Sequence, residues 1–484
     1  MTDSLKQKTV KGVSWSFVEQ ILTRGVNFVI GIILARLLSP TDYGLVGMLT
    51  IFIAFSQIFV DGGLTNALIR EKDASDKDYS TVYITNMTLS VIFYFLLFFS
   101  APLVATYYEQ PLLKPLMRVI SLILIISSVA SVQGTLLTKR VDFRTKFAIS
   151  FISALVSGAA GVICALKGLG PWALVAQSVA SASAVTILTL AFVRWMPQLI
   201  FSKESFKRLF SYSYKLMAAS LINTIYSNIY PMVIGKRFSA SDVGMFTRGN
   251  QFPTVASETL VSTFNRVAYP VLSKVQDDDR RLIEVFDKFL QIFYFLAFPV
   301  LLVLCGCSRP LVSLLLTDKW LPCVPLMQLL CISKLPTGMI RNNLILLYVK
   351  GRSDLALRME IIKKAIMFPI MFVSMFFGLK AFCCALIVNS WIDMYCSAYY
   401  TRKILNYRLW DQLKTVFPYL FISLILLAES LLASYFIANN WISLGVSLVV
   451  CTATYYLVTK LMHLYAFNEA MGLLRKRTIN VEED

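Results

Sequence analysis

The sequence predicts an all-α polytopic membrane protein with about fourteen transmembrane helices. Its 484 residues are 57% hydrophobic and only 15% charged, and the mean hydropathy of +0.66 is too high for a soluble globular chain. The apolar residues form long continuous runs rather than alternating with polar ones, which is typical of membrane helices and not of barrel strands. A short segment also occurs twice, which indicates a duplicated unit.

Windows of about 20 apolar residues mark the predicted spans in chain order. Polar or charged residues separate consecutive windows, so that each window is bounded and long enough for one helix to cross the hydrocarbon layer. The predicted spans are residues 13–37, 44–66, 81–106, 115–137, 147–166, 170–193, 212–234, 243–270, 286–306, 322–348, 358–378, 380–400, 415–437 and 441–463.

The duplicated segment is Ser-Pro-Thr-Asp-Tyr-Gly at 39–44, which returns as Ser-Ala-Ser-Asp-Val-Gly at 239–244. Both copies lie between two predicted spans, and six spans separate them, so both halves of the chain start on the same side of the membrane. The duplication predicts two six-helix bundles related by a pseudo-two-fold axis along the membrane normal. The residues assigned to this hairpin motif are Arg36, Asp42, Gly44, Asp242 and Gly244.

Six segments follow from the spans and the duplication. They are an N-terminal six-helix bundle over 1–194, a cytoplasmic amphipathic linker over 195–211, a C-terminal six-helix bundle over 212–400, a cytoplasmic connector over 401–414, two extra transmembrane helices over 415–463 and a cytoplasmic tail over 464–484.

The formal charge of +18 comes from basic residues in the short connections between spans. Alternate connections hold about 31 Lys and Arg against about 7 in the others, and this asymmetry predicts that both termini are cytoplasmic. The basic residues are therefore topology signals, and nucleic acid is not an expected partner.

Polar and basic side chains recur on single helical faces inside the predicted spans. An intramembrane Arg costs about 2.5–3.5 kcal/mol, so a group of them indicates a wet cavity, although internal ion pairs and snorkelling to the interface are the alternatives for each one. A guanidinium binds phosphate or carboxylate with two hydrogen bonds, which predicts an anionic cargo. The candidate cleft residues are Arg24, Asn27, Arg248, Gln251, Arg266 and Arg341.

Three acidic residues inside spans, Asp61, Glu258 and Asp393, are candidates for coupling to a proton or a sodium ion. A hydrogen bond between helices or an ion pair with a nearby Arg is the alternative for each. The single His463 and the scattered cysteines give no metal-site spacing, so no resident metal or cofactor and no enzymatic activity are expected.

Ala35-Arg36-Leu37-Leu38 followed by Asp42-Tyr43-Gly44, in the first hairpin of a basic multi-span chain, resembles the polysaccharide-transport branch of the multidrug, oligosaccharidyl-lipid and polysaccharide exporter superfamily. The likeness is to flippases of the O-antigen and colanic-acid type. It implies two bundles around a V-shaped cleft, alternating access, and a bacterial inner-membrane location. The implied cargo is a polyprenyl-diphosphate-linked oligosaccharide, moved to the periplasmic leaflet for surface polysaccharide synthesis. Membrane lipids and the polysaccharide polymerase machinery are the further partners that it implies.

Lipid II flippases of the same superfamily use arginines on the first, second and eighth helices. Arg24 and Arg266 occupy suitable places here, but the second predicted span holds no Arg, which favours another lipid-linked glycan. Two other functions stay open: a drug or cation antiporter of the same superfamily, and a non-transporting assembly factor or polymerase subunit.

Overall fold

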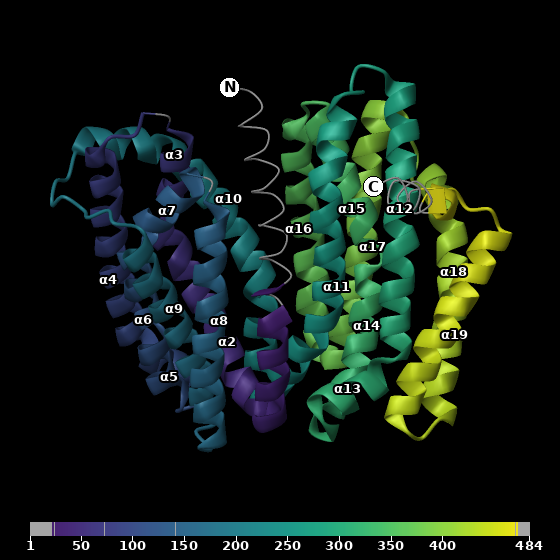
Figure 1. The fold of residues 1–484 in the computed structure, drawn as a ribbon, viewed down its shortest axis with the longest axis horizontal. Helices are drawn as coiled ribbons and strands as arrows, with labels where there is room; N and C mark the ends of the chain where they lie inside the picture. Colours follow the sequence, from purple (N-terminus) through teal and green to yellow (C-terminus); the bar gives the residue numbers. More distant parts are fainter. Residues whose placement is uncertain (1–21, 24, 72, 141, 470, 473–484) are drawn as a thin grey trace, which may run out of the picture. The chain divides into compact units, whose positions relative to one another are not determined.

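The computed structural model describes residues 22, 23, 25–71, 73–140, 142–469, 471 and 472, and these residues form helices without any strand (Figure 1). They divide into two compact units, Met1–Gly244 and Met245–Asp484, called here unit 1 and unit 2. The all-α class predicted from the continuous apolar runs is confirmed.

Unit 1 consists of nine labelled helices preceded by a shorter apolar helix within the described residues. The shorter helix is Gly25–Leu37, and the labelled helices are α2 (Pro40–Asp61), α3 (Leu64–Arg70), α4 (Asp76–Tyr107), α5 (Leu113–Ile120), α6 (Leu122–Val129), α7 (Ser131–Lys139), α8 (Phe143–Leu166), α9 (Trp172–Phe192) and α10 (Lys203–Arg237).

Unit 2 begins within α11, whose first five residues belong to unit 1. Its elements are α11 (Ala240–Ser273), α12 (Asp279–Gly306), α13 (Ser308–Leu316), the 3₁₀ turn η1 (Asp318–Cys323), α14 (Val324–Lys334), α15 (Thr337–Val349), α16 (Ser353–Ser374), the 3₁₀ turn η2 (Met375–Phe377), α17 (Leu379–Leu405), α18 (Leu409–Phe436) and α19 (Asn440–Leu461).

Nine helices in the described residues are long and apolar enough to cross a membrane, or ten if one bent pair counts as a single span. Several predicted spans differ from the observed helices in their bounds. The second ends at Asp61 because Gly62 and Gly63 adopt positive φ angles that break the helix. The span predicted over 115–137 is divided among α5, α6 and α7, and the one over 322–348 is interrupted at Pro336, as a proline removes a helical N–H donor. The number fourteen stays a prediction.

The segment predicted as a linker over 195–211 has two parts. Its second part is helical, because Ser202 caps the start of α10 and the helix then runs without interruption to Arg237. The contacts place α10 in unit 1 and divide the chain after Gly244. The division into two units does not test the six predicted segments, which stay a prediction.

The two copies of the duplicated segment fold alike, since each forms a reciprocal cap at a helix start. Asp42 Oδ2 accepts from the Ser39 backbone N at 2.8 Å and from Ser39 Oγ at 2.7 Å, while the Asp42 N–H donates back to Ser39 Oγ at 3.2 Å. Asp242 and Ser239 repeat all three bonds at 3.0, 2.8 and 3.1 Å. The repeated Ser and Asp therefore satisfy N–H groups that a helix start leaves unpaired.

The repeated glycines bring these two helix starts into reciprocal backbone contact. A methyl group on Gly44 would overlap the carbonyl oxygen of Ala240, and one on Gly244 would overlap the carbonyl oxygen of Pro40. Each glycine therefore touches the residue that begins the opposite helix. Gly44 meets Ala240 in the same way as Gly244 meets Pro40, and these are equivalent positions of the two copies. A two-fold relationship produces a reciprocal contact of this kind.

A pair of buried amides joins α15 to α18 in unit 2. Asn343 Nδ2 donates to Gln412 Oε1 at 2.8 Å, and Gln412 Nε2 donates to Asn343 Oδ1 at 3.1 Å. Both side chains are fully buried. Asn343 Nδ2 also donates to the Met339 carbonyl oxygen at 2.8 Å, whereas both side-chain hydrogen bonds of Gln412 are made with Asn343.

We expect Asn343→Leu to lower the stability of the protein by about 1–3 kcal/mol, because it leaves a buried Gln412 amide without its partner. The double variant Asn343→Leu/Gln412→Leu should recover most of that loss, since it removes both polar groups together. Thermal unfolding of the detergent-solubilised protein measures both effects. A double variant as unstable as the sum of the two single variants would contradict this pairing.

Candidate functional site

The polar face predicted on α11 is present at its first turns. Arg248 is buried, and its Nη1 donates a short hydrogen bond to Gln251 Oε1 one turn later. The two side chains therefore lie on one face, as their spacing predicts. Gly249, the residue after Arg248, lies against the peptide backbone of Cys323 and Met327, so the first turns of α11 pack on η1 and α14 of the same unit.

A group of charged residues from three helices lies further along α11 in unit 2. Lys334 at the end of α14 interacts electrostatically with Glu258 on α11 and with Arg341 on α15. Glu258, Arg266 and Arg341 are exposed in the isolated chain, whereas Lys334 is half-buried. The structure thus brings Glu258, Lys334 and Arg341 together, and Lys334, which the sequence analysis left out of the candidate site, belongs to it.

The candidates in unit 1 are more scattered. Asp61 is the last residue of α2 rather than an interior one, and Gln57 one turn earlier lies within hydrogen-bonding reach of its carboxylate. Asn27 and Arg36 are exposed on the helix at 25–37. Arg24 lies outside the described residues. The predicted cleft between the two halves stays a prediction.

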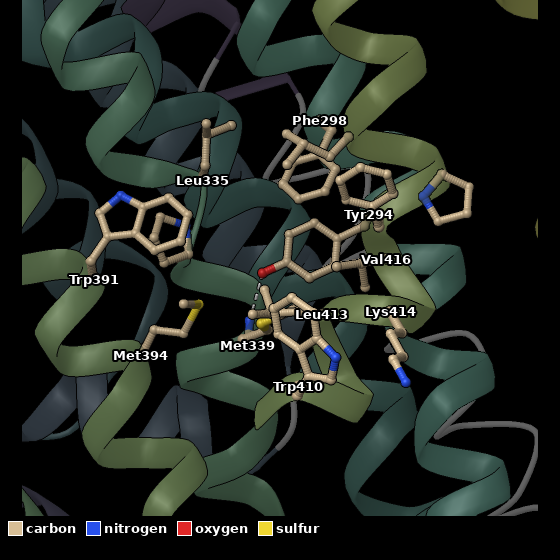
Figure 2. Close-up of a pocket in the computed structure, with 14 residues that line it drawn as sticks. Tyr294, Phe298, Leu335, Met339, Trp391, Met394, Trp410, Leu413, Lys414 and Val416 are labelled. Atoms are coloured by element: carbon tan, nitrogen blue, oxygen red, sulfur yellow. Dashed lines mark hydrogen bonds between the residues drawn. The ribbon is translucent and has the colours of Figure 1, made fainter. Parts of the chain in front are cut away.

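Unit 2 also contains an apolar cavity of about 540 Å³ (Figure 2). Side chains from α12, α15, α17 and α18 line it, among them Tyr294, Met339, Trp391 and Trp410. The Tyr294 hydroxyl does not face it as a free polar group, because it accepts a hydrogen bond from the Met339 N–H at 2.8 Å. Lys414 on α18 is the one charged residue among the described residues that line this cavity. The cavity suits an apolar chain next to a negatively charged group.

Asp393 on α17 has a partner that the sequence analysis missed. Lys363 is one of the about 31 basic residues assigned to connections, although it falls inside the span predicted over 358–378. The structure places it inside α16, where it is buried and forms ion pairs with Glu360 and Asp393. The alternatives for Asp393 were a hydrogen bond between helices and an ion pair with a nearby Arg. The structure shows a contact between helices, and its partner is Lys363 rather than an arginine. The Glu360 and Lys363 spacing of three residues was a signal for it, since such pairs meet on one helical face.

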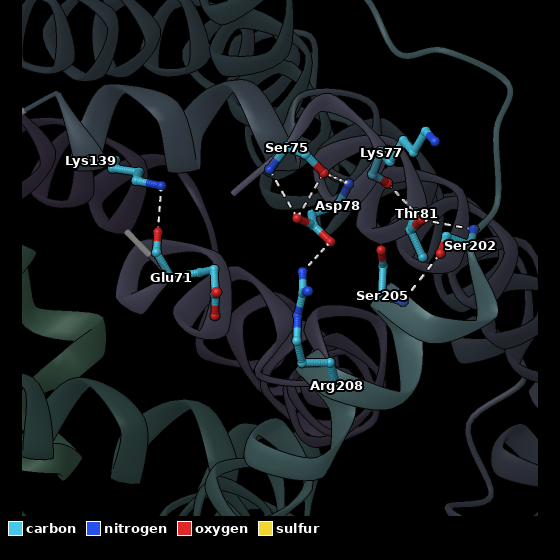
Figure 3. Close-up of polar contacts among 9 residues, drawn as sticks. All are labelled: Glu71, Ser75, Lys77, Asp78, Thr81, Lys139, Ser202, Ser205 and Arg208. Atoms are coloured by element: carbon cyan, nitrogen blue, oxygen red, sulfur yellow. Dashed lines mark hydrogen bonds and ion pairs between the residues drawn. The ribbon is translucent and has the colours of Figure 1, made fainter. Parts of the chain in front are cut away.

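A second polar group joins the start of α10, together with Ser202 just before it, to the start of α4 in unit 1 (Figure 3). Arg208 Nη2 lies 2.6 Å from Oδ1 of the buried Asp78, whose other oxygen accepts from Ser75. The Ser202 backbone N donates to Thr81 Oγ1 at 3.1 Å. At the far end of the same two helices, Lys236 Nζ donates to the carbonyl oxygen of Tyr107 at 2.6 Å. Both ends of α10 are thus bonded to α4.

A family described as "Polysaccharide biosynthesis protein" matches residues 33–325. The lipopolysaccharide biosynthesis protein WzxC of Escherichia coli (strain K12) is 27% identical over 376 residues, covering 76% of this chain and 75% of that protein. The succinoglycan biosynthesis transport protein ExoT of Rhizobium meliloti (strain 1021) is 28% identical over 335 residues, covering 69% of this chain and 68% of that one.

Two solved structures share the fold. The lipid II flippase MurJ in an inward closed conformation matches with a TM-score of 0.75 at 13% identity, covering 94% of this chain and 99% of that one. An inward-facing multidrug resistance transporter of the MATE family matches with a TM-score of 0.64 at 13% identity, covering 80% and 94%. The names of these proteins describe transport or biosynthesis, and none describes an enzyme.

Proposed function

Because the chain belongs to the polysaccharide biosynthesis protein family and is a multi-pass membrane protein like its bacterial relatives, we propose that it is a flippase for a polyprenyl-diphosphate-linked oligosaccharide. It moves this cargo from the cytoplasmic to the periplasmic leaflet by alternating access, for the synthesis of a surface polysaccharide. Relatives named for lipopolysaccharide and succinoglycan biosynthesis support the cargo class. The polysaccharide polymerase that uses the product is a further proposed partner.

The observation that carries this proposal is the group of Lys334, Arg341 and Glu258 inside unit 2. Two cations beside one carboxylate leave a net positive charge, which favours an anionic ligand. A diphosphate offers oxygens that a guanidinium binds in pairs, so Arg341 and the exposed Arg266 are the side chains assigned to it. The apolar cavity near Lys414 suits the isoprenoid part of the same molecule.

The sidedness of the protein follows from its charge distribution. Alternate connections hold about 31 basic residues against about 7, so both termini lie in the cytoplasm of a bacterial cell whose inner membrane holds the protein. Cysteine labelling from outside the cell tests this assignment: a cysteine introduced near the C-terminus should resist an impermeant reagent.

We expect Arg266→Ala/Arg341→Ala to slow cargo transfer at least about tenfold, since each lost charge-assisted hydrogen bond to a phosphate is worth about 1.5–3 kcal/mol. The assay uses the purified protein in liposomes with a fluorescent polyprenyl-diphosphate oligosaccharide and measures which leaflet holds the fluorophore. Arg280→Ala, an exposed arginine at the start of α12, is the matched control and should transfer cargo at the wild-type rate.

Two outcomes would redirect the proposal. Wild-type transfer rates in the double variant would remove these arginines from the mechanism. A drug or cation antiporter, the alternative function, needs an acidic cleft rather than a basic one, and drug sensitivity of a deletion strain with intact glycans would favour it. Transfer by the pure protein also excludes a non-transporting assembly factor.

A further inference from the structure

Unit 1 contains an apolar cavity of its own, of about 470 Å³, between α2, α4 and α10, which pack on one another. This volume falls within the range of about 300–1,000 Å³ that is typical of small-molecule sites. The Ser100 hydroxyl at its wall already donates to the Leu97 carbonyl oxygen at 3.2 Å. The cavity therefore suits a ligand without polar groups. Its aliphatic and aromatic lining includes Ile51, Phe52, Phe55, Phe93, Val104 and Met232.

Two of the lining side chains also reach the surface of the described chain. Phe55 on α2 is 37% exposed and Leu96 on α4 is 53% exposed. Both helices are long and apolar enough to cross a membrane, so their exposed apolar side chains suit contact with hydrocarbon. A hydrocarbon chain can therefore enter the cavity sideways, without passing through the interior of the unit.

The cavity lies toward one end of these three helices. A methyl group on Gly235 of α10 would touch the side chains of Met48 on α2 and Tyr108 just after α4. These residues therefore lie at one level, where the three helices close together. The lining residues Ile51 and Met232 each come three positions from this level, about one helical turn. The cavity thus begins one turn inside the closed end.

Lys236 stands at the closed end of the cavity. It follows the lining residue Met232 by four positions on α10, which places the two on one helical face. Tyr107 follows the lining residue Val104 on α4 by three positions, with the same result. Lys236 Nζ donates to the Tyr107 carbonyl oxygen at 2.6 Å and lies 3.6 Å from the exposed Glu109 carboxylate. An ammonium has three donors, so Lys236 can also bond to a phosphate oxygen.

The charge at this end suits an anion. Arg237 follows Lys236 at the end of α10, so two cations stand beside the one carboxylate of Glu109. The cavity of unit 2 is built in the same way, since Lys414 lies at its edge near the start of α18. The asymmetry of basic residues assigns the start of α18 to the cytoplasmic side and the end of α10 to the periplasmic side. The two cavities are thereby assigned to opposite leaflets, each with a lysine at the level of the headgroups.

We propose that the cavity of unit 1 is an isoprenoid site on the delivery side, which holds the polyprenyl chain in the periplasmic leaflet while Lys236 binds the phosphate. This proposal rests on the proposed function, because a flipped carrier needs a place for its chain in the second leaflet. Binding there stabilises the state of the transporter that has delivered its cargo. A single chain that ends in phosphate matches one apolar cavity with one lysine at its end, which favours a polyprenyl phosphate over a two-chain phospholipid.

The test uses the full-length protein in nanodiscs and a polyprenyl phosphate that carries a diazirine on its chain. After irradiation, mass spectrometry of the digested protein identifies the labelled peptides. We expect label on the parts of α2 and α4 that line the cavity of unit 1, and unlabelled polyprenyl phosphate should compete with it. Equal labelling of these parts by a diazirine-bearing phosphatidylglycerol, or label confined to unit 2, would overturn the proposal.

Ser100→Trp should lower the labelling of unit 1 at least about tenfold and leave that of unit 2 unchanged, because the indole fills the cavity. Phe99→Trp is the matched control, since Phe99 is 70% exposed and is not among the lining residues. It should be labelled as the wild type is. Thermal unfolding of both variants checks that they are folded, and full labelling of a folded Ser100→Trp would contradict the site.

Lys236→Gln tests the phosphate end of the site without filling the cavity. It should need at least about tenfold more polyprenyl phosphate for half-maximal labelling, because a charge-assisted hydrogen bond is lost. The concentration needed of the uncharged polyprenol with the same diazirine should not change. Lys380→Gln, which alters an exposed lysine at the start of α17, is the matched control. An equal loss for the phosphate and the alcohol would remove Lys236 from the site.

Labelling and cargo transfer are separate measurements, which keeps the two proposals apart. Labelling of the unit 1 cavity in a protein that transfers no cargo in liposomes would count against the proposed function alone. Transfer by the wild type with label only in unit 2 would count against the unit 1 site alone.

Discussion

Replacing Gly44 with alanine is expected to destabilise the protein by at least about 3 kcal/mol, because the new methyl group would overlap the backbone of Ala240. The obstacle is a peptide carbonyl rather than the end of a flexible side chain, so relief requires the start of α2 or of α11 to move. Gly244→Ala should have a similar effect through Pro40. Thermal unfolding in detergent, together with the yield of monodisperse protein, measures the loss.

Gly134→Ala is the matched control for this experiment. Gly134 lies inside α7 with no atom within 4 Å of the position a methyl group would take. Alanine is preferred over glycine in a helix by about 1 kcal/mol, so this variant should be at least as stable as the wild type. Equal stability of Gly44→Ala and Gly134→Ala would contradict the reciprocal contact.

Replacing Lys363 with methionine should cost about 3–5 kcal/mol of stability, because the partly buried carboxylates of Glu360 and Asp393 would then lose their common cation. Adding Asp393→Asn should restore much of the loss, since only Glu360 would remain charged and Lys364 still lies beside it. Thermal unfolding of the single and double variants gives the coupling between the two residues.

Lys364→Met is an unusually close control, because it changes the neighbouring lysine of the same helix. Lys364 is more exposed than Lys363, and its Nζ lies 3.8 Å from Glu360 Oε2, so the loss should stay under about 1 kcal/mol. If both lysine variants lose the same stability, the burial of Lys363 between two carboxylates is not what holds α16 to α17.

Local features of the fold could be predicted from the sequence. The long apolar runs specify helices because backbone groups in a membrane must pair within their own segment. The repeated Ser and Asp specify two identical caps because a capping box involves residues only three positions apart. Arg248 and Gln251 could be placed on one helical face because they are only three positions apart.

Features that depend on distant residues could not be predicted. Nothing in the spacing of Gly44 shows that it touches Ala240, since that contact joins segments far apart in the chain. Lys363 sits next to other basic residues and so resembled a topology signal, and only the folded hairpin reveals Asp393 opposite it. Glycine is tolerated inside membrane helices, so Gly62 and Gly63 did not reveal the end of α2.

The bonds at both ends of α10 restrict how this part of the molecule can move. Arg208 and Lys236 on α10 are nearly as far apart in sequence as their partners Asp78 and Tyr107 on α4, so the two helices run in the same direction with matched attachment points. Sliding one past the other by a single turn would break both attachments at once. These two attachments favour a joint tilt of the two helices, so that a displacement at one end of the pair is transmitted to the other end.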